Sequence, residues 1–355
     1  MRTDYQRKSS LAKGQEVFIG MHVHKESWQV TMRSKGEEIF HSRLPSQYQA
    51  LEKLIERLPG CKVKVAYEAG PCGFSLYDKL TADGIETIVV PPTLIPVESG
   101  NKVKTDRRDS RKIAHLLERD MLKKVYVLSE EDRADRELVR TRRQITEHRS
   151  DAMRQIKSKL LFYGIKPPFT ATQCWSNAYV KWLKEYKFDS DLLRVSLDYL
   201  IGLYEYLTSQ LVKLTKEVIL LAKSKKYSKR VKLLKSVPGI GTLTAIEILV
   251  ELQDMKRFKS SDKLAAYIGL TPSEFSSGQY VRQGRITHSG NKRVRACLVE
   301  SSWILIAKDP FMRKRYQELK NRKGGKKAIV AIARMLIIRV RRILLDNEPY
   351  LLKAA

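Results

Sequence analysis

The stretch Val17-Phe-Ile-Gly-Met-His-Val23 opens the part of the chain that decides the fold. Two further β-like runs follow it closely, Trp28-Gln-Val-Thr-Met32 and Glu37-Glu-Ile-Phe-His-Ser-Arg-Leu44. The turns between the three runs are short and polar, at Lys25-Glu26 and Lys35-Gly36, which predicts an antiparallel meander.

Helices and strands alternate after this meander. The spacing of Leu51, Leu54, Ile55 and Leu58 predicts a helix. We expect a strand over 62–67, a helix over 74–80, a strand over 87–90 and a basic helix from Asp106. This order predicts a mixed α/β sheet over residues 17–125, with the strand order of a ribonuclease-H-like domain, after a flexible lead-in at 1–16.

Residues 126–228 have the pattern of long helices. Apolar side chains recur from Leu193 to Leu221 at alternating steps of four and three residues, and a second basic helix over 130–161 precedes them. Such spacing predicts a coiled coil in an antiparallel helical hairpin, used internally or for dimerisation. An ordinary helix of a bundle fits the same heptads.

Residues 229–355 are expected to be mostly helical and to contain a helix–hairpin–helix at Pro238-Gly-Ile-Gly241. Gly239 and Gly241 carry no Cβ, so a backbone can approach them closely. The amide groups that open the next helix can then bind a phosphate without reading a base. A plain helical connection is the alternative.

The charge of the chain narrows the classes of function. Lys and Arg number 68 and Asp and Glu 39, a net charge of +29, which points to a polyanion such as nucleic acid or an acidic membrane. No run approaches the ~20 apolar residues of a membrane span, and no secretory signal is present. Four scattered cysteines argue against a disulfide framework. We therefore expect a cytoplasmic, nucleoid-associated protein without a membrane partner.

Three acidic residues stand out against this basic background. Glu68 ends the predicted strand over 62–67, and Asp106 and Asp109 lie three residues apart on one face of a helix. Carboxylates at strand ends and on a nearby helix can hold Mg²⁺ ions that activate a phosphodiester. Alternatively, Asp106 is only a helix N-cap and Asp109 only an ion partner of a neighbouring arginine.

Several motifs in order resemble one family, over residues 16–350. They are Ile19-Gly-Met-His-Val-His-Lys25, Tyr67-Glu-Ala-Gly-Pro-Cys-Gly73, Lys104-Thr-Asp-Arg-Arg-Asp-Ser-Arg-Lys112, Leu264-Ala-Ala-Tyr-Ile-Gly-Leu-Thr-Pro272, Ser276-Ser-Gly278 and Gly290-Asn-Lys-Arg-Val-Arg295. The chain resembles the DEDD transposases of insertion sequences, of the one-ten type, which are bridge-RNA-guided recombinases. The resemblance implies a RuvC-like domain, a coiled coil and a C-terminal transposase domain with a catalytic serine. It also implies DNA, a structured noncoding guide RNA and further copies of the chain, as a dimer or a synaptic tetramer, as partners.

One position departs from the family pattern. His22 stands where the family has its first acidic residue, and imidazole is a poor ligand for Mg²⁺. Three interpretations remain: His22 binds Mn²⁺ or a water of the metal shell, the other three acids suffice, or this copy is inactive. His24 is expected to be a polar surface residue.

Ser277 is the serine that the resemblance makes the nucleophile on the DNA phosphodiester. Gly278 beside it would let the substrate approach. Basic residues around it could stabilise the added phosphoryl charge, namely Arg282, Arg285, Lys292, Arg293 and Arg295. Without the resemblance, the segment is a polar turn. The arginines at 140–143 also suit contact with a duplex.

These observations predict a DNA transposase that cuts and rejoins strands through a RuvC-like metal site at His22, Glu68, Asp106 and Asp109 and through Ser277. Two alternatives remain open. The chain could be a RuvC-like metal-dependent nuclease or junction resolvase, or a nucleic-acid-binding protein whose metal site has lapsed.

Overall fold

A computed structural model of the chain describes residues 12–96, 105–188, 190–275, 277, 280, 282–287 and 289–352. The chain divides into two compact units, residues 1–128 and 129–355, and each is described by itself. Ser276, Gly278 and Gln279 lie outside the described residues, so the expectation for Gly278 is not addressed.

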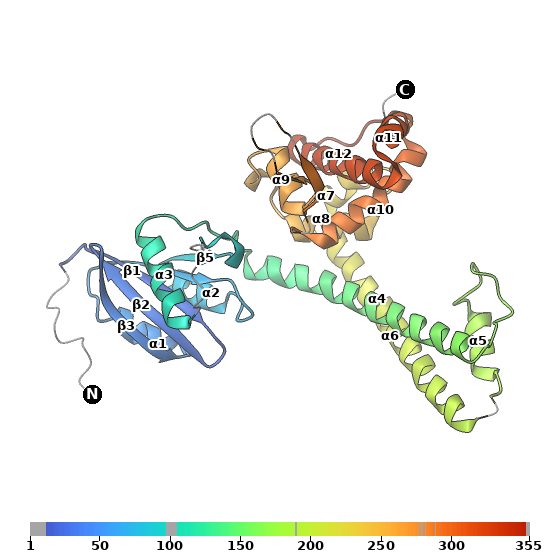
Figure 1. Cartoon of the computed structure of the whole chain (residues 1–355), viewed down its shortest axis with the longest axis horizontal. Coiled ribbons are helices and arrows are strands. Elements are labelled where there is room, and N and C mark those ends of the chain that lie inside the picture. Colours follow the sequence, from blue (N-terminus) through green and yellow to red (C-terminus); the bar gives the residue numbers. More distant parts are fainter. Residues whose placement is uncertain are drawn as a thin grey trace. The chain divides into compact units, whose positions relative to one another are not determined.

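The first unit is built on a five-stranded mixed sheet in the order β3-β2-β1-β4-β5 (Figure 1). The first three strands pair antiparallel, and β1, β4 and β5 run parallel. This confirms the predicted mixed α/β sheet, and its order is consistent with a ribonuclease-H-like fold. The elements are β1 (Glu16–Val23), β2 (Ser27–Ser34), β3 (Glu37–Pro45), α1 (Tyr48–Ile55), β4 (Lys62–Glu68), α2 (Ser75–Ala82), β5 (Glu86–Val90), the 3-10 turn η2 (Pro92–Leu94) and α3 (Asp106–Glu118).

The alternation of side chains along β1 places α1 and α2 on one face of this sheet and α3 on the other. Val17, Ile19 and Met21 are buried in one core together with side chains of α1 and α2. Phe18 lies in a separate core with Ile113 of α3. Since successive side chains of a strand point to opposite faces, even-numbered positions of β1 lie on the α3 side.

Helix α3 is clamped onto the sheet at both ends and in its middle. A Cβ on Gly20 would lie 2.1 Å from the backbone nitrogen of Ala114, so the helix crosses β1 at a distance that only glycine permits. Ser110 in α3 shares a buried hydrogen bond with Thr31 of β2. At the far end, Arg33 donates to Glu118 at 2.7 Å.

The second unit begins with two 33-residue helices, α4 (Glu130–Phe162) and α6 (Asp191–Lys223), which pack against each other (Figure 1). The predicted apolar seam faces inward, since Leu197, Tyr204, Leu207 and Val218 are buried. The shorter α5 (Asn177–Glu185) covers one end of the pair with a cluster of aromatic rings.

The other end of the helix pair enters a helical core that extends to residue 343. The core is formed from α7 (Ser228–Leu234), α8 (Thr242–Leu252), the 3-10 turn η3 (Met255–Arg257), α9 (Ser261–Ile268), α10 (Lys292–Lys308), α11 (Pro310–Lys323) and α12 (Gly325–Asp346), with the strands β6 (Pro272–Glu274) and β7 (Gln283–Ile286) between α9 and α10.

Among the described residues, no helix is long and apolar enough to cross a membrane.

Candidate functional site

The alternation of side chains along β1 and β4 brings two of the predicted site residues to the same corner of the first unit. His22 lies near the end of β1 and Glu68 ends β4, and these strands are parallel neighbours in which Met21 pairs with Tyr67. Both positions are even-numbered, as is Ala66, which belongs to the α3-side core. Their side chains therefore share the α3 face, at the edge where the two parallel strands end.

Helix α3 brings the third residue to this corner. Because α3 crosses β1 at Gly20, its first turn lies over the end of the strand. The N-cap is Thr105, whose side chain accepts a hydrogen bond from the backbone nitrogen of Arg108. Asp106 is thus not the cap, and its carboxylate is available at the sheet edge.

Two imidazoles and a carboxylate meet there. The Nε2 atoms of His22 and His24 lie 2.8 Å apart. Asp106 places Oδ1 3.5 Å from Nε2 of His22 and Oδ2 3.3 Å from Nε2 of His24. Glu68 approaches from the other side, with Oε2 3.9 Å from Nδ1 of His22. We call His22, His24 and Asp106 the strand-end cluster.

Two buried polar atoms at this corner have no hydrogen-bond partner among the described residues, Nδ1 of His22 and Oδ2 of Asp109. Asp109 is not part of the close cluster. The neighbouring Arg111 donates two hydrogen bonds to Glu38. Unpaired polar atoms beside convergent ligand atoms suit a metal site, because a bound ion or its water would satisfy them.

The donor set indicates which ions fit. Mg²⁺ in proteins is bound by oxygen atoms, whereas imidazole nitrogen suits transition metals. The strand-end cluster therefore fits a divalent transition ion better than Mg²⁺.

Sequence reasoning expected His24 at the surface, and its side chain is indeed half exposed. What it missed is that His22 and His24, two apart at a strand end, meet on one face.

Ser277 lies in the second unit, on an extension of the β6–β7 hairpin. The ladder pairs Pro272 with Ile286, continues with Phe275 donating to the carbonyl of Arg282, and ends in a bridge between Ser277 and Tyr280. Ser277 is exposed. The aromatic side chains nearby are exposed as well, Phe275 by 72% and Tyr280 by 84%.

The five predicted basic contacts occupy different environments. Arg282, Arg285 and Lys292 are exposed, and Arg293 is partly buried. The guanidinium of Arg295 donates to the carbonyls of Ile268 and Ser289, at 2.9 and 3.3 Å. Arg295 thus joins the end of α9 to the loop before α10.

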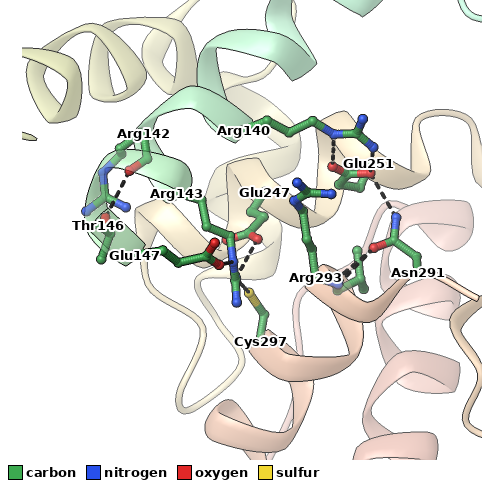
Figure 2. Close-up of polar contacts among 11 residues, drawn as sticks. Arg140, Arg142, Arg143, Thr146, Glu147, Glu247, Glu251, Asn291, Arg293 and Cys297 are labelled. Carbon is green, nitrogen blue, oxygen red and sulfur yellow. Dashed lines mark hydrogen bonds and ion pairs between the residues drawn. The ribbon is translucent and has the colours of Figure 1, made fainter. Parts of the chain in front are cut away.

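A buried carboxylate holds Asn291, the cap of α10, which follows β7 by five residues and which we call the base of this hairpin (Figure 2). Glu251 of α8 is 2% exposed and receives two hydrogen bonds from Arg140, at 2.6 and 2.8 Å. It also accepts a hydrogen bond from the amide of Asn291, which caps α10. Burial alone would raise the pKa of Glu251, but the bonds from Arg140 hold it below its ordinary value of 4.5.

The neighbouring arginines of α4 are also engaged inside the unit. Arg143 donates to Glu247 at 2.9 Å, and Arg142 donates to Thr215 of α6 at 2.9 Å. With Arg140 bound to Glu251, each of these three guanidinium groups has a partner inside the unit, and the expectation that residues 140–143 contact a duplex stays a prediction. Sequence reasoning missed Glu251, one of two acids in the otherwise apolar helix α8, although an acid in such a helix signals a buried ion pair.

The two glycines of the predicted hairpin differ. Gly239 has φ +91°, and a Cβ there would lie 2.5 Å from the carbonyl oxygen of Ser301 in α10. Its lack of a side chain therefore serves packing. Gly241 is the N-cap of α8, and a Cβ there would meet nothing within 4 Å.

Two family models match the chain. Residues 19–165 match a transposase model named for the DEDD transposases of the IS110 type, and residues 231–317 match the model described as "Transposase IS116/IS110/IS902 family". The matched segments include all the predicted acidic residues, His22 and Ser277.

Several curated proteins are similar to this chain. The protein y4qE of Sinorhizobium fredii, whose name describes a transposase, is 31% identical over 299 residues, covering 83% of this chain and 73% of that protein. The transposase for insertion sequence element IS1111A of Coxiella burnetii is 25% identical over 349 residues, covering 94% and 90%. A pilin gene-inverting protein of Moraxella bovis is 32% identical over 124 residues, covering 34% and 38%.

Proposed function

The chain belongs to the IS116/IS110/IS902 family of transposases, and from that premise we propose that it cuts and rejoins DNA strands with a metal centre in its first unit and a serine nucleophile in its second. The observation that carries the proposal is the convergence of His22, Glu68 and Asp106 at one sheet edge. The side-chain alternation of β1 and β4 and the close crossing of α3 over β1 bring these residues together.

We assign the metal centre to His22, Glu68, Asp106 and Asp109, with Mg²⁺ or Mn²⁺ as the divalent ion. A bound ion would supply a Lewis acid for a phosphodiester oxygen. The residues hold its ligand atoms in place, and the acids of the first turn also lie at the positive end of the α3 dipole. Of the two ions, Mn²⁺ fits the imidazole of His22 better.

Ser277 is proposed as the nucleophile that forms a phosphoserine link to DNA. Its exposure at the end of the hairpin suits attack on a bulky duplex, and Arg282 and Arg285 on the same hairpin are placed to bind phosphate. The exposed rings of Phe275 and Tyr280 offer stacking surfaces for unpaired bases. In the attack, the serine Oγ–P bond forms as the bond to the leaving strand's oxygen breaks, and that oxygen takes a proton.

Other contacts with phosphate are proposed at the exposed Lys292, at Arg293 and Arg295, and at Gly239 and Gly241. Gly241 has the stronger support, because it caps the 11-residue helix α8 and has open space around it. In this proposal α7 and α8 form the helix–hairpin–helix, which binds DNA without reading its sequence.

Self-association is proposed through the helix pair α4–α6, as a coiled coil. Besides the seam that faces α4, helix α6 carries a second apolar stripe on its outside. Leu192, Tyr199 and Tyr206 recur every seven residues and are 81%, 78% and 61% exposed. Heptad spacing on a free face favours a second copy of the chain as its partner, giving a dimer or a synaptic tetramer.

A structured noncoding RNA is the proposed guide, and the protein is proposed to be cytoplasmic and nucleoid-associated. The net charge of +29 suits a folded RNA held through its backbone. Sequencing the nucleic acid that copurifies with the chain checks this. We expect one discrete structured RNA, and random fragments would contradict the guided mechanism.

The metal-dependent reaction is tested with DNA that carries the ends of the chain's own element. Wild-type protein with Mn²⁺ should cut and rejoin it, and Asp106→Asn should lower the rate by more than the ~100-fold that loss of an outer-shell partner of a metal ligand can cost. His115→Gln is the matched control, since His115 is exposed on the same helix. Cutting without rejoining favours a nuclease or resolvase, and binding without cutting favours a lapsed enzyme.

A further inference from the structure

We propose that His22, His24 and Asp106 form a site for one divalent transition-metal ion of the Zn²⁺, Co²⁺ and Mn²⁺ class, and that this site discriminates against Mg²⁺. The inference deepens the proposed function, because it names the ion class of the same metal centre and adds His24 as a ligand. It also implies that His22 is a ligand of the ion.

The distances suit a common ion. The three ligand atoms lie within 4.8 Å of one another. Nitrogen and oxygen ligands at about 2.0–2.1 Å from a tetrahedral ion are ~3.3 Å apart. Oδ1 of Asp106 lies 3.5 Å from Nε2 of His22, and Oδ2 lies 3.3 Å from Nε2 of His24, so each carboxylate oxygen already stands near ligand spacing from one ring.

The distance between Nε2 of His22 and Nε2 of His24 is shorter than the spacing of two ligands, because the two rings share a hydrogen bond. At 2.8 Å, one Nε2 donates a hydrogen bond to the other, so a single proton lies between them. An ion that takes the place of this proton would bind both nitrogens after a separation of about 0.5 Å. His24 follows the last residue of β1 and is half exposed, so its ring can move this far.

Glu68 has a distinct part in this arrangement. An imidazole that binds an ion through Nε2 carries its proton on Nδ1, and metal-bound histidines commonly donate that proton to a carboxylate. Nδ1 of His22 is buried without a hydrogen-bond partner among the described residues, and Oε2 of Glu68 is 3.9 Å away. Glu68, besides its place in the metal centre, therefore positions His22 with respect to this ion.

Selectivity follows from the ligand atoms. The affinity of a site with two nitrogens and one carboxylate rises from Mn²⁺ through Co²⁺ and is higher still for Zn²⁺. Mg²⁺ instead demands near-octahedral oxygen ligands. Both His24 and Asp106 are more than half exposed, so the site is open to solvent and can keep water or a phosphate oxygen as a further ligand.

Binding of Co²⁺ to the full-length chain tests the proposal without any measurement of DNA cleavage. An untagged chain is stripped with a chelator and titrated with Co²⁺, whose visible ligand-field absorption reports nitrogen coordination. We expect one equivalent to bind, an equivalent of Zn²⁺ to displace it, and a large excess of Mg²⁺ to leave it in place.

Variants assign the ligands. His24→Ala should weaken Co²⁺ binding by more than the ~100-fold that loss of a second-sphere partner can cost, and Glu68→Gln should weaken it about 10–100-fold. His115→Ala should leave it unchanged, since His115 is an exposed histidine of α3 outside the cluster. His22→Asp should lower the affinity for Co²⁺ and let Mg²⁺ compete. Far-ultraviolet circular dichroism checks that each variant is folded.

The outcomes separate this inference from the proposed function. Co²⁺ binding that survives His24→Ala, or that Mg²⁺ displaces as readily as Zn²⁺ does, overturns the site even if the chain cuts DNA with Mg²⁺. A His24-dependent Co²⁺ site in a chain that never cuts DNA supports the site and contradicts the proposed function.

Discussion

The strand-end cluster of the first unit and the hairpin that carries Ser277 in the second are held in opposite ways. The cluster lies where two paired strands end beneath a clamped helix, with α3 fixed at Gly20, Ser110 and Glu118. The hairpin consists of strands of three and four residues and extends by single bridges to an exposed serine.

The difference follows from what each site has to do. Metal ligands must be held within about 0.5 Å of their binding positions before an ion arrives, so rigid elements carry most of them. A nucleophile for a duplex must instead protrude far enough to reach a phosphate that cannot enter a pocket. Near the base of the hairpin, Glu251 fixes the cap of α10.

Removing the charge at that base should have the largest effect on stability. Glu251→Gln breaks a buried ion pair and leaves Arg140 without its partner, at a cost of about 3–5 kcal/mol in the free energy of unfolding of the second unit. Urea denaturation measures this. Glu147→Gln is the matched control, because Glu147 also binds an arginine of α4 but is 64% exposed, and should cost at most ~1 kcal/mol.

The same carboxylate makes stability depend on pH. The folded-state pKa of Glu251 is lowered by Arg140, so its contribution is present above the ordinary value of 4.5 and is lost as pH falls through the lower folded value. Wild-type protein should therefore lose more stability than Glu251→Gln when urea denaturation is repeated below pH 4.5. Equal losses would show that the hairpin base does not depend on this charge.

The clamp over the metal site is tested at Gly20. Gly20→Ala places a Cβ against the backbone of α3, which cannot yield as a side chain can, and should cost the first unit about 3 kcal/mol. Displacement of α3 should also weaken Co²⁺ binding. Gly202→Ala, at an open position in α6, should instead stabilise the chain by about 0.5–1 kcal/mol. A neutral Gly20→Ala would contradict the clamp.

The exposed part of the hairpin should show the smallest effect, on binding and not on folding. Replacing Arg282 and Arg285 by Gln should weaken DNA binding and reduce the slope of log affinity against log salt by about 2, one for each lost phosphate contact. Fluorescence anisotropy at several salt concentrations measures it. Lys181→Gln, an exposed lysine of α5, serves as the control. An unchanged slope would remove these arginines from the interface.

Local patterns predicted most of the first unit. Alternation and turn chemistry located the strands near β1, β2, β3, β4 and β5, and the periodic leucines located α1, because these signals span only a few residues. The heptads from Leu193 to Leu221 likewise fall within one helix, α6, and face inward. The supercoil and the partner of the outer stripe stay predictions, since heptads alone do not name what packs on them.

Contacts between distant residues could not be predicted in the same way. Sequence reasoning placed His22 at a metal site by resemblance, but pairing with His24 requires the register of β1 and the direction of both rings. Glu251 binds Arg140 and Asn291, which lie 111 and 40 residues away. The role of Gly239 in packing against Ser301 likewise appears only once α10 is placed.

The central claim, that Ser277 is the nucleophile of a metal-dependent recombinase, is tested most directly by trapping the protein on labelled DNA in the presence of Mn²⁺. Wild-type chain and the neighbouring Ser276→Ala variant should both yield a covalent protein–DNA adduct on a denaturing gel, and Ser277→Ala should yield none. An adduct with Ser277→Ala, or metal-dependent cutting that this variant performs as fast as wild type, would contradict the account.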